Sequence, residues 1–280
     1  MRRIGQWVWK ACIRALKICA ICYLILCIGC ASFQRRLIYF PPSVNPAEVE
    51  QYAASQNLTR WTGRHGEPIG WKRLSLTQPA SGQVLITHGN AGCAFQCGHY
   101  ADAIQQAAPW DIYIVEYPGY ENRPGSPTEH TLYAAADEAL DLLPTNRPTY
   151  LVGESLGTGV ATYLAGKHPH KIEGVVLLGA YNSLVSVAQA HMVILPVSLL
   201  LVDRFPSEVH LRDYHGPVAM LVAGRDTVVP ERFGRRLYKT YQGPKRLWEF
   251  PEGNHGTVML QPPEIWKQII DFLQTNRTQY

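Results

Sequence analysis

The sequence predicts an α/β protein whose central sheet is mostly parallel and is covered by helices on both faces. Two observations lead to this fold class. Short, nearly unbroken apolar runs alternate with segments of helix length, which is the pattern of parallel strands buried on both faces. Distinctive glycine-rich or polar segments follow these runs directly, at the carboxyl ends of strands where such sheets bind ligands. The chain of 280 residues has room for one large domain of this kind behind a short N-terminal segment.

The N-terminal segment, residues 1–33, differs in composition from the rest of the chain. Basic residues without any acid precede an uncharged apolar run from Ile18 to Gly29. This order is typical of a signal peptide, and the run is short for a helix that crosses about 30 Å of hydrocarbon. The end of the run, Cys27-Ile28-Gly29-Cys30, resembles a bacterial lipobox with Cys30 as the lipid-bearing residue, although leucine is usual where Cys27 stands.

Three interpretations of residues 1–33 stay open. They are a cleaved lipoprotein leader, an uncleaved signal anchor lengthened by the residues on either side, and a eukaryotic anchor with palmitoylated cysteines. Each of them attaches the domain of residues 34–280 to a membrane. In the first two, the basic residues remain in the cytoplasm, so the domain lies in the periplasm or elsewhere outside the cytoplasm.

The domain begins with a short amphipathic link from Phe33 to Pro42 and a polar, irregular stretch over residues 43–68. Trp71 to Thr77 alternates in polarity, which predicts an antiparallel strand at a sheet edge. Strands and helices alternate from there on. The predicted strands are residues 83–87, 111–116, 149–152, 174–178, 218–223 and 246–250, and the predicted helices are residues 100–108, 131–143, 158–167, 232–241 and 263–273.

Charge and cysteine content exclude several classes of function. Five of the 26 basic residues lie in residues 1–33, which leaves 21 basic against 22 acidic residues in the domain, without the basic excess that binds nucleic acid. Cys93 and Cys97 are the domain's only cysteines and suit neither a disulfide framework nor a metal knuckle. No dinucleotide-binding loop or Walker motif follows a predicted strand, so we expect no metal and no organic cofactor.

A candidate nucleophile, Ser155, lies in the segment Gly153-Glu154-Ser155-Leu156-Gly157. A predicted strand leads into this G-x-S-x-G segment and a predicted helix follows it. A serine on such a strand-to-helix turn presents its hydroxyl above the sheet, and the flanking glycines let backbones approach closely. Taken alone, the segment is a weak signal for catalysis, because an ordinary glycine-rich turn that carries a capping serine has the same pattern.

Two further residues supply what a serine nucleophile needs, a base that takes its proton and an acceptor that orients the base. His255 follows the last predicted strand, in a tight Gly-Asn-His-Gly loop, and Asp226 follows the strand before it. Parallel strands end at one edge of a sheet, so both are expected near Ser155. His88, at the end of strand 83–87, is expected to brace the loop behind it.

The sequence resembles membrane-anchored serine hydrolases of the α/β-hydrolase superfamily, near the Bem46-like group and its depalmitoylating relatives. The order nucleophile, acid, base along the chain is that of this superfamily. The matching segments span roughly residues 34–256 and are QRRLIYFPP, HGNAG, YPGYENRPGSPTE, GESLGTGVA, the aspartate of AGRDTVVP, and GNHG. Glu154 and the segment from Cys93 to Cys97 depart from the family pattern but leave the three candidate residues in place.

The resemblance implies the α/β-hydrolase fold and cleavage of acyl esters or thioesters through an acyl-enzyme intermediate, without a cofactor. It also implies an oxyanion hole made by the backbone N–H groups of Leu156 and of Asn90, in the HGNAG segment. Two alternatives remain: a serine peptidase with the same triad, and a catalytically silent, membrane-tethered binding module.

Residues 181–213 fall where this fold inserts its lid, between the strands at 174–178 and 218–223. Within them, residues 192–202 form a nearly unbroken apolar run around Pro196. A connection of this kind should lie at the surface, where such a run is unusual. It is therefore either a helix packed into the core, or a segment that lines an acyl pocket above Ser155 or touches the membrane.

Overall fold

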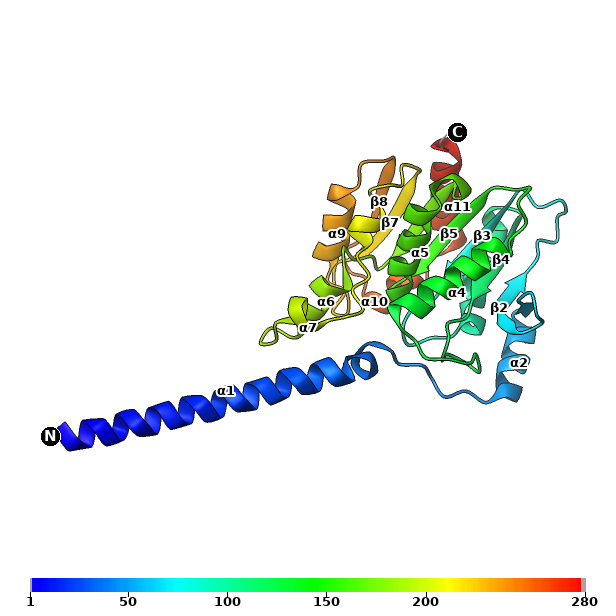
Figure 1. Ribbon diagram of the computed structural model, residues 1–280. Helices are drawn as coiled ribbons and strands as arrows, with labels where there is room; N and C mark the ends of the chain where they lie inside the picture. Colours follow the sequence, from blue (N-terminus) through cyan, green and yellow to red (C-terminus); the bar gives the residue numbers. More distant parts are fainter. Residues whose placement is uncertain (1, 278–280) are drawn as a thin grey trace.

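The computed structural model describes residues 2–277, with side chains from Trp7 onward except that of Val8. Met1 and residues 278–280, the outer ends of the two expected domains, lie outside this range. One long helix, α1 (Arg2–Ile38), extends away from a body that contains all the other elements (Figure 1).

The described residues form one sheet of eight strands in the order β1-β2-β4-β3-β5-β6-β7-β8. Strands β3 to β8 pair in parallel, whereas β2 pairs antiparallel with both β1 and β4. The mostly parallel sheet predicted from the sequence is therefore confirmed. The strands are β1 (Thr59–Thr62), β2 (Pro68–Arg73), β3 (Gly82–Thr87), β4 (Trp110–Val115), β5 (Thr149–Glu154), β6 (Gly174–Leu178), β7 (Val218–Ala223) and β8 (Lys245–Phe250).

Helices cover both faces of the sheet, as predicted. One face carries α4 (Glu129–Asp141), α5 (Leu156–Lys167) and α9 (Glu231–Thr240), and the other carries α2 (Pro46–Ser55), α3 (Gly98–Ala107), α10 (His255–Met259) and α11 (Pro263–Thr275). Short 3₁₀ turns lie at η1 (Ala94–Cys97) and η2 (Pro169–Lys171). The connection between β6 and β7 carries α6 (Leu184–His191), α7 (Val197–Leu200) and α8 (Ser207–His210).

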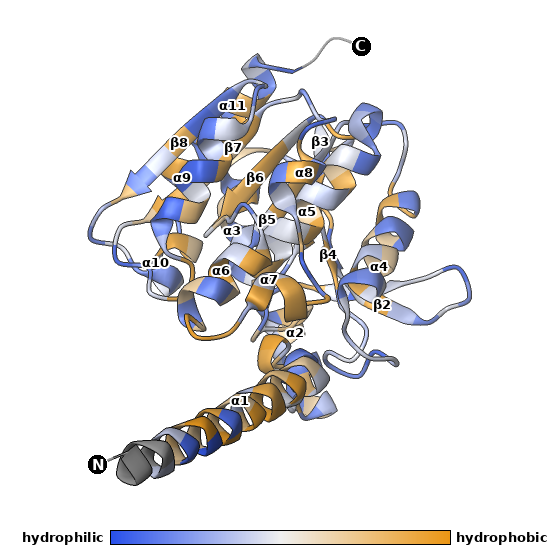
Figure 2. Cartoon of the chain, turned by 60° about the vertical axis from the view of Figure 1, so that its left-hand side comes forward, coloured by the Kyte–Doolittle hydropathy of each residue, from blue (hydrophilic) through white to orange (hydrophobic). Residues whose placement is uncertain are grey.

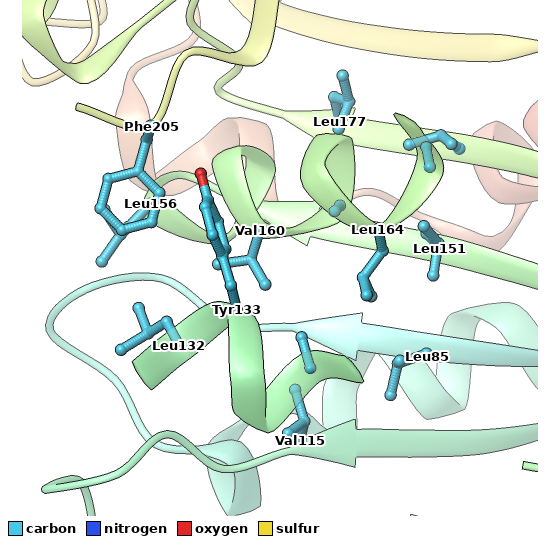
Figure 3. Packing of buried hydrophobic residues seen from close by; sticks show 14 of the residues in the cluster. Leu85, Val115, Leu132, Tyr133, Leu151, Leu156, Val160, Leu164, Leu177 and Phe205 are labelled. Atoms are coloured by element: carbon cyan, nitrogen blue, oxygen red, sulfur yellow. The ribbon is translucent and has the colours of Figure 1, made fainter. Parts of the chain in front are cut away.

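The strands divide their side chains between two apolar cores because successive residues of a strand point to opposite faces. In β3, Leu85 packs in the layer of α4 and α5, whereas Val84 and Ile86 pack in the layer of α3 and α11. Figure 3 shows the first of these layers, with Leu132 and Leu164 of the two helices over the strands. Strands buried on both faces account for the unbroken apolar runs in the sequence.

The stretch 43–68, predicted to be irregular, contains α2 and β1, and this prediction was wrong. Asn45 caps α2 by accepting a hydrogen bond from the Ala47 N–H at 3.0 Å, and Val49 and Ala53 bury one side of the helix. Strand β1 takes the edge position that was predicted for β2. Both elements are short, so neither leaves a strong periodic signal, and each is stabilised by packing on the body.

Helix α1 is longer than the apolar run predicted within it. It continues from Arg2 to Ile38 because no proline interrupts it before Pro41. Its stretch Trp9–Ile38 is long and apolar enough to cross a membrane, judged by length and composition. Figure 2 shows apolar residues along this helix and also on α7, which lies beside the end of the helix nearest the body.

Candidate active site

Ser155 sits on a sharp turn between β5 and α5. Its backbone angles are φ 49° and ψ −115°, in a region that residues other than glycine rarely occupy. The turn requires glycine on either side of it. A Cβ atom on Gly157 would lie 2.0 Å from the carbonyl oxygen of Thr87, and one on Gly153 would lie 2.7 Å from the Cα of Thr158. The close backbone approach predicted from the G-x-S-x-G segment is thus present.

The three candidate residues lie in one chain of hydrogen bonds. The Ser155 Oγ is 2.9 Å from Nε2 of His255, and Nδ1 of His255 is 2.7 Å from Oδ2 of Asp226. The other carboxylate oxygen of Asp226 accepts hydrogen bonds from the backbone N–H groups of Val228 and Val229, at 2.8 and 2.7 Å. Because Asp226 is buried and held at both oxygens, its carboxylate fixes the orientation of the imidazole ring.

His255 is the first residue of α10, and not part of a loop as predicted from its glycine-rich surroundings. Asn254 caps this helix: its side chain accepts from the Thr257 N–H at 3.1 Å, and its own N–H donates to the Thr257 hydroxyl at 2.8 Å. A Cβ on Gly179, after β6, would lie 3.3 Å from the His255 ring. The cap fixes the start of α10, and the absence of a side chain at Gly179 leaves room for the His255 ring.

Asn90 and Leu156, the expected oxyanion-hole residues, both border the same cavity as Ser155. Among the described residues, no hydrogen bond uses the backbone N–H of either one. The side chain of Asn90 is fully engaged, however. Its oxygen accepts from the Tyr120 hydroxyl at 2.8 Å and from the Phe40 N–H at 3.2 Å, and its nitrogen donates to the Ile38 carbonyl.

A buried ion pair lies beneath the loop that carries Asn90. Nε2 of His88 is 2.9 Å from Oε1 of Glu116, and Glu116 also accepts from the N–H groups of Ala94 and Tyr117. Burial by itself would lower the pKa of His88, but the adjacent Glu116 carboxylate outweighs it, so the pKa is raised. His88 makes no hydrogen bond to the three candidate residues and instead braces the loop, as the sequence predicts.

An apolar cavity of about 340 Å³ opens beside Ser155. It is bordered by Leu156 and Tyr181 on the body and by the connection between β6 and β7. The lining residues of that connection are Leu184, Val187, Ala188, His191, Met192, Leu195, Val197, Leu200 and Leu201. A cavity of this size and composition suits an apolar small-molecule group.

Sequence reasoning missed the wall of this cavity that α1 supplies. Residues Cys30, Ala31, Gln34, Leu37 and Ile38 line it, with Phe40 just beyond the helix. The sequence does carry a signal, because spacings of three and four place residues 30, 31, 34 and 38 along one helical stripe. The sequence-based prediction divides this stripe between the membrane-directed segment, residues 1–33, and the amphipathic link from Phe33 to Pro42, whereas one helix contains both parts of the stripe.

The two cysteines of the body do not add a reactive group to this site. Cys93 and Cys97 are free and buried, and burial raises the pKa of the Cys93 thiol to about 12, which disfavours a reactive thiolate. Three or more metal-ligating side chains do not gather anywhere in the part of the chain with described positions.

A mostly parallel sheet with a serine on a strained turn at its carboxyl edge defines the class of α/β hydrolases. Comparison with known proteins agrees: residues 82–211 match the family model of the alpha/beta hydrolase fold. The uncharacterized protein Rv2307c of Mycobacterium tuberculosis is 33% identical over 88% of this chain and 92% of its own length. The chain therefore belongs to the α/β-hydrolase family, in its Bem46-like group.

Two further relatives support the placement in this group. The uncharacterized membrane protein YNL320W of Saccharomyces cerevisiae is 31% identical over 78% of this chain and 79% of its own length. The protein bem46 of Schizosaccharomyces pombe is 27% identical over 69% of this chain and 67% of its own length.

Solved structures share the fold at low sequence identity. The Pyrococcus furiosus esterase Pf2001 has a TM-score of 0.60 at 15% identity, covering 85% of this chain and 98% of the esterase. A monoacylglycerol lipase of Paleococcus ferrophilus has a TM-score of 0.57 at 20% identity, covering 78% of this chain and 98% of the lipase. At these identities, the likeness concerns the fold.

Proposed function

We propose that this protein is a membrane-attached serine hydrolase that cleaves acyl esters or thioesters. The observation that carries the proposal is the hydrogen-bond chain from Ser155 through His255 to Asp226, at the mouth of an apolar cavity. The esterase and lipase named above share the fold, which adds support for ester chemistry.

In the proposed reaction, Ser155 attacks the carbonyl carbon of the substrate while His255 takes the proton of the serine hydroxyl. Asp226 holds the ring in the tautomer that accepts this proton and stabilises the imidazolium that forms. His255 then gives the proton to the leaving alcohol or thiol, and an acyl group remains on Ser155. Water, deprotonated by His255, attacks this acyl-enzyme and releases the acid.

The backbone N–H groups of Leu156 and Asn90 are proposed to hold the oxyanion of each tetrahedral intermediate. Two observations support this role: both residues border the cavity, and neither backbone N–H makes a hydrogen bond to another described residue. Leu156 is also the first residue of α5, where the helix dipole favours negative charge. A preorganised donor of this kind is worth about 3 kcal/mol of transition-state stabilisation.

The cavity favours an acyl group over a peptide as the group bound beside Ser155. Its lining is apolar, and it offers few polar partners for the backbone groups of a peptide. Each methylene buried there contributes about 0.8 kcal/mol to binding. Residues 181–213 then act as a lid, with the apolar run 192–202 forming part of the acyl pocket.

We propose that α1 stays attached as a membrane anchor. The helix passes unbroken through Cys30, and Cys27 is buried against Leu195 and Val197 of the lid, contacts that cleavage before Cys30 would remove. Five basic residues precede the uncharged run and two, Arg35 and Arg36, follow it, which favours a cytoplasmic N-terminus and a body outside the cytoplasm.

Two experiments test this proposal. The first is labelling with a fluorophosphonate, which reacts with activated serines: the wild-type chain should be labelled and Ser155→Ala, with an unchanged melting temperature, should not. A variant that is still labelled would mean that the nucleophile is another residue.

The second experiment measures the mass of the membrane-bound protein. A full-length mass supports the anchor, whereas a lipid-modified chain that begins at Cys30, and whose processing Cys30→Ser blocks, would contradict it.

A further inference from the structure

We propose that α1 is part of the substrate site as well as an anchor: its stretch Cys30–Ile38 forms one wall of the acyl pocket and determines which acyl chains fit. This inference rests on the proposed function. The observation behind it is that one continuous cavity is bordered both by Ser155 and by five residues of α1. An anchor that served only to attach the body would need no contact with the site.

The wall is built from one side of the helix. Cys30, Ala31 and Gln34 are all partly buried and face the cavity, whereas their neighbours Ser32 and Phe33 are exposed. Ala31 is the smallest residue of this wall, so it leaves space beside Cys30 and Gln34 on the helical stripe. The lid faces this stripe across the cavity, with Leu200 and Leu201 among its lining residues. An acyl chain in the cavity would therefore lie between α1 and the lid.

Specific polar contacts hold this wall against the lid. The Gln34 side chain donates to the Leu200 carbonyl at 3.2 Å and accepts from the Val202 N–H at 2.7 Å. Beside these contacts, the buried Asp203 accepts from Arg35, the residue after Gln34, at 3.2 Å and from the Tyr39 hydroxyl at 3.0 Å.

The contact extends toward the N-terminal half of α1. The Tyr23 hydroxyl donates to the Ile194 carbonyl at 2.8 Å, and Cys27 is buried against the lid. Since Tyr23 and Cys27 belong to the uncharged run of the helix, the lid lies along the segment that would enter the bilayer. The exposed apolar side chains of Val193, Ile194 and Leu199 lie on the same part of the lid.

The test compares two substitutions on adjacent residues of α1 in the full-length protein. Ala31→Trp places a large side chain in the cavity, and Ser32→Trp places the same side chain on the exposed side of the helix. The quantity measured is the ratio of kcat/KM for a p-nitrophenyl palmitate to that for p-nitrophenyl acetate, in one detergent. We expect Ala31→Trp to lower this ratio by about tenfold or more, which corresponds to the loss of two or more buried methylenes. Ser32→Trp should leave it within about twofold.

The possible results separate the inference about α1 from the proposed function. Equal ratios in the two variants, or an equal loss on both esters in Ala31→Trp, would overturn the inference and leave the proposed function standing. A wild-type chain that hydrolyses neither these esters nor the corresponding palmitoyl and acetyl thioesters would overturn the proposed function, and the inference with it. If Ala31→Trp does not fold, Gln34→Ala replaces it: loss of the contacts to Leu200 and Val202 should lower the same ratio, and an unchanged ratio would overturn the inference.

Discussion

The side-chain oxygen of Asn90 accepts a hydrogen bond from the backbone N–H of Phe40 at 3.2 Å, so the loop after β3 is tied to the end of α1. The same carboxamide binds the Ile38 carbonyl and the Tyr120 hydroxyl. The segment that connects α1 to the body thus helps to position a loop whose backbone N–H is proposed to bind the oxyanion. Residues 50 positions apart in the chain are coupled through one side chain.

Asn90→Ala tests this coupling, because it keeps the backbone N–H and removes only the side-chain contacts. We expect kcat on both short and long esters to fall by about tenfold, less than the loss of a whole oxyanion donor. The lost hydrogen bonds should cost about 1 kcal/mol each, or a few degrees in melting temperature. An unchanged kcat in a stably folded variant would mean that the loop keeps its position without this contact.

Asp226→Asn should lower turnover by about 10⁴-fold while the protein stays folded. An amide nitrogen facing Nδ1 of His255 would favour the tautomer with the wrong nitrogen protonated, as in a serine protease that carries this change. The contacts to Val228 and Val229 use the other oxygen and can persist, so the melting temperature should change little. Steady-state rates on an acetate ester measure the effect, and near-wild-type turnover would point to a different acid.

Gly157→Ala should unfold the turn that carries Ser155. The added Cβ would lie 2.0 Å from the Thr87 carbonyl oxygen, a backbone atom that cannot move without displacing β3. We expect a loss of about 3 kcal/mol or more in unfolding free energy, at the upper end for single substitutions. Gly92→Ala is the matched control, because its Cβ would meet only a side-chain atom at 3.4 Å. Similar melting temperatures for the two variants would contradict this account of the turn.

Stability should depend on pH through His88. Its pKa is raised in the folded state, above the usual value of about 6.5 that applies when the chain is unfolded. The stabilisation from the charged pair with Glu116 is therefore fully present below about pH 6.5 and is lost as pH rises through the folded-state pKa of His88.

Unfolding measurements on the wild type and Glu116→Gln between pH 6 and pH 9 test this dependence. The variant should be less stable by about 3–5 kcal/mol at pH 6, the usual cost of breaking a buried pair, and by less at pH 9. Thr87→Ser is the control, because it changes a buried residue next to His88 without changing any charge. Its free energy of unfolding should differ from that of the wild type by the same amount at both pH values. A Glu116→Gln difference that grows with pH would have the wrong sign for this mechanism.

Leu200→Asp should lower kcat/KM for long-chain esters far more than for acetate esters. Leu200 lines the cavity, so a charge there would oppose burial of an acyl chain, at about 0.8 kcal/mol for each methylene excluded. Its neighbour Leu199 is 82% exposed, which makes Leu199→Asp the matched control in detergent solution. If both variants lose stability, or if both ester classes suffer equally in Leu200→Asp, the segment belongs to the core and does not form a lid.

The sequence by itself determined the order of the main helices and strands. It also determined which residues follow the carboxyl ends of the parallel strands. Strands such as β6 and β7 have the predicted bounds because burial on both faces requires unbroken apolar residues. The sequence also allowed Ser155, Asp226 and His255 to be predicted as the candidate nucleophile, acid and base, for a related reason. Each lies within five residues of the end of a parallel strand, and parallel strands bring the residues after them to one edge of the sheet.

Only the tertiary structure decided what surrounds these three residues. Helix α2 and strand β1 are too short to carry a periodic signal, and packing on the body stabilises them. The role of the Asn90 side chain depends on contacts with the end of α1, 50 positions away in the chain. The wall that Ala31 and Gln34 form depends on α1 lying against the connection between β6 and β7, a contact between residues more than 150 positions apart. A local pattern records which side of a helix is apolar, but it does not record what that side will contact, because the partner is chosen by the packing of the whole chain.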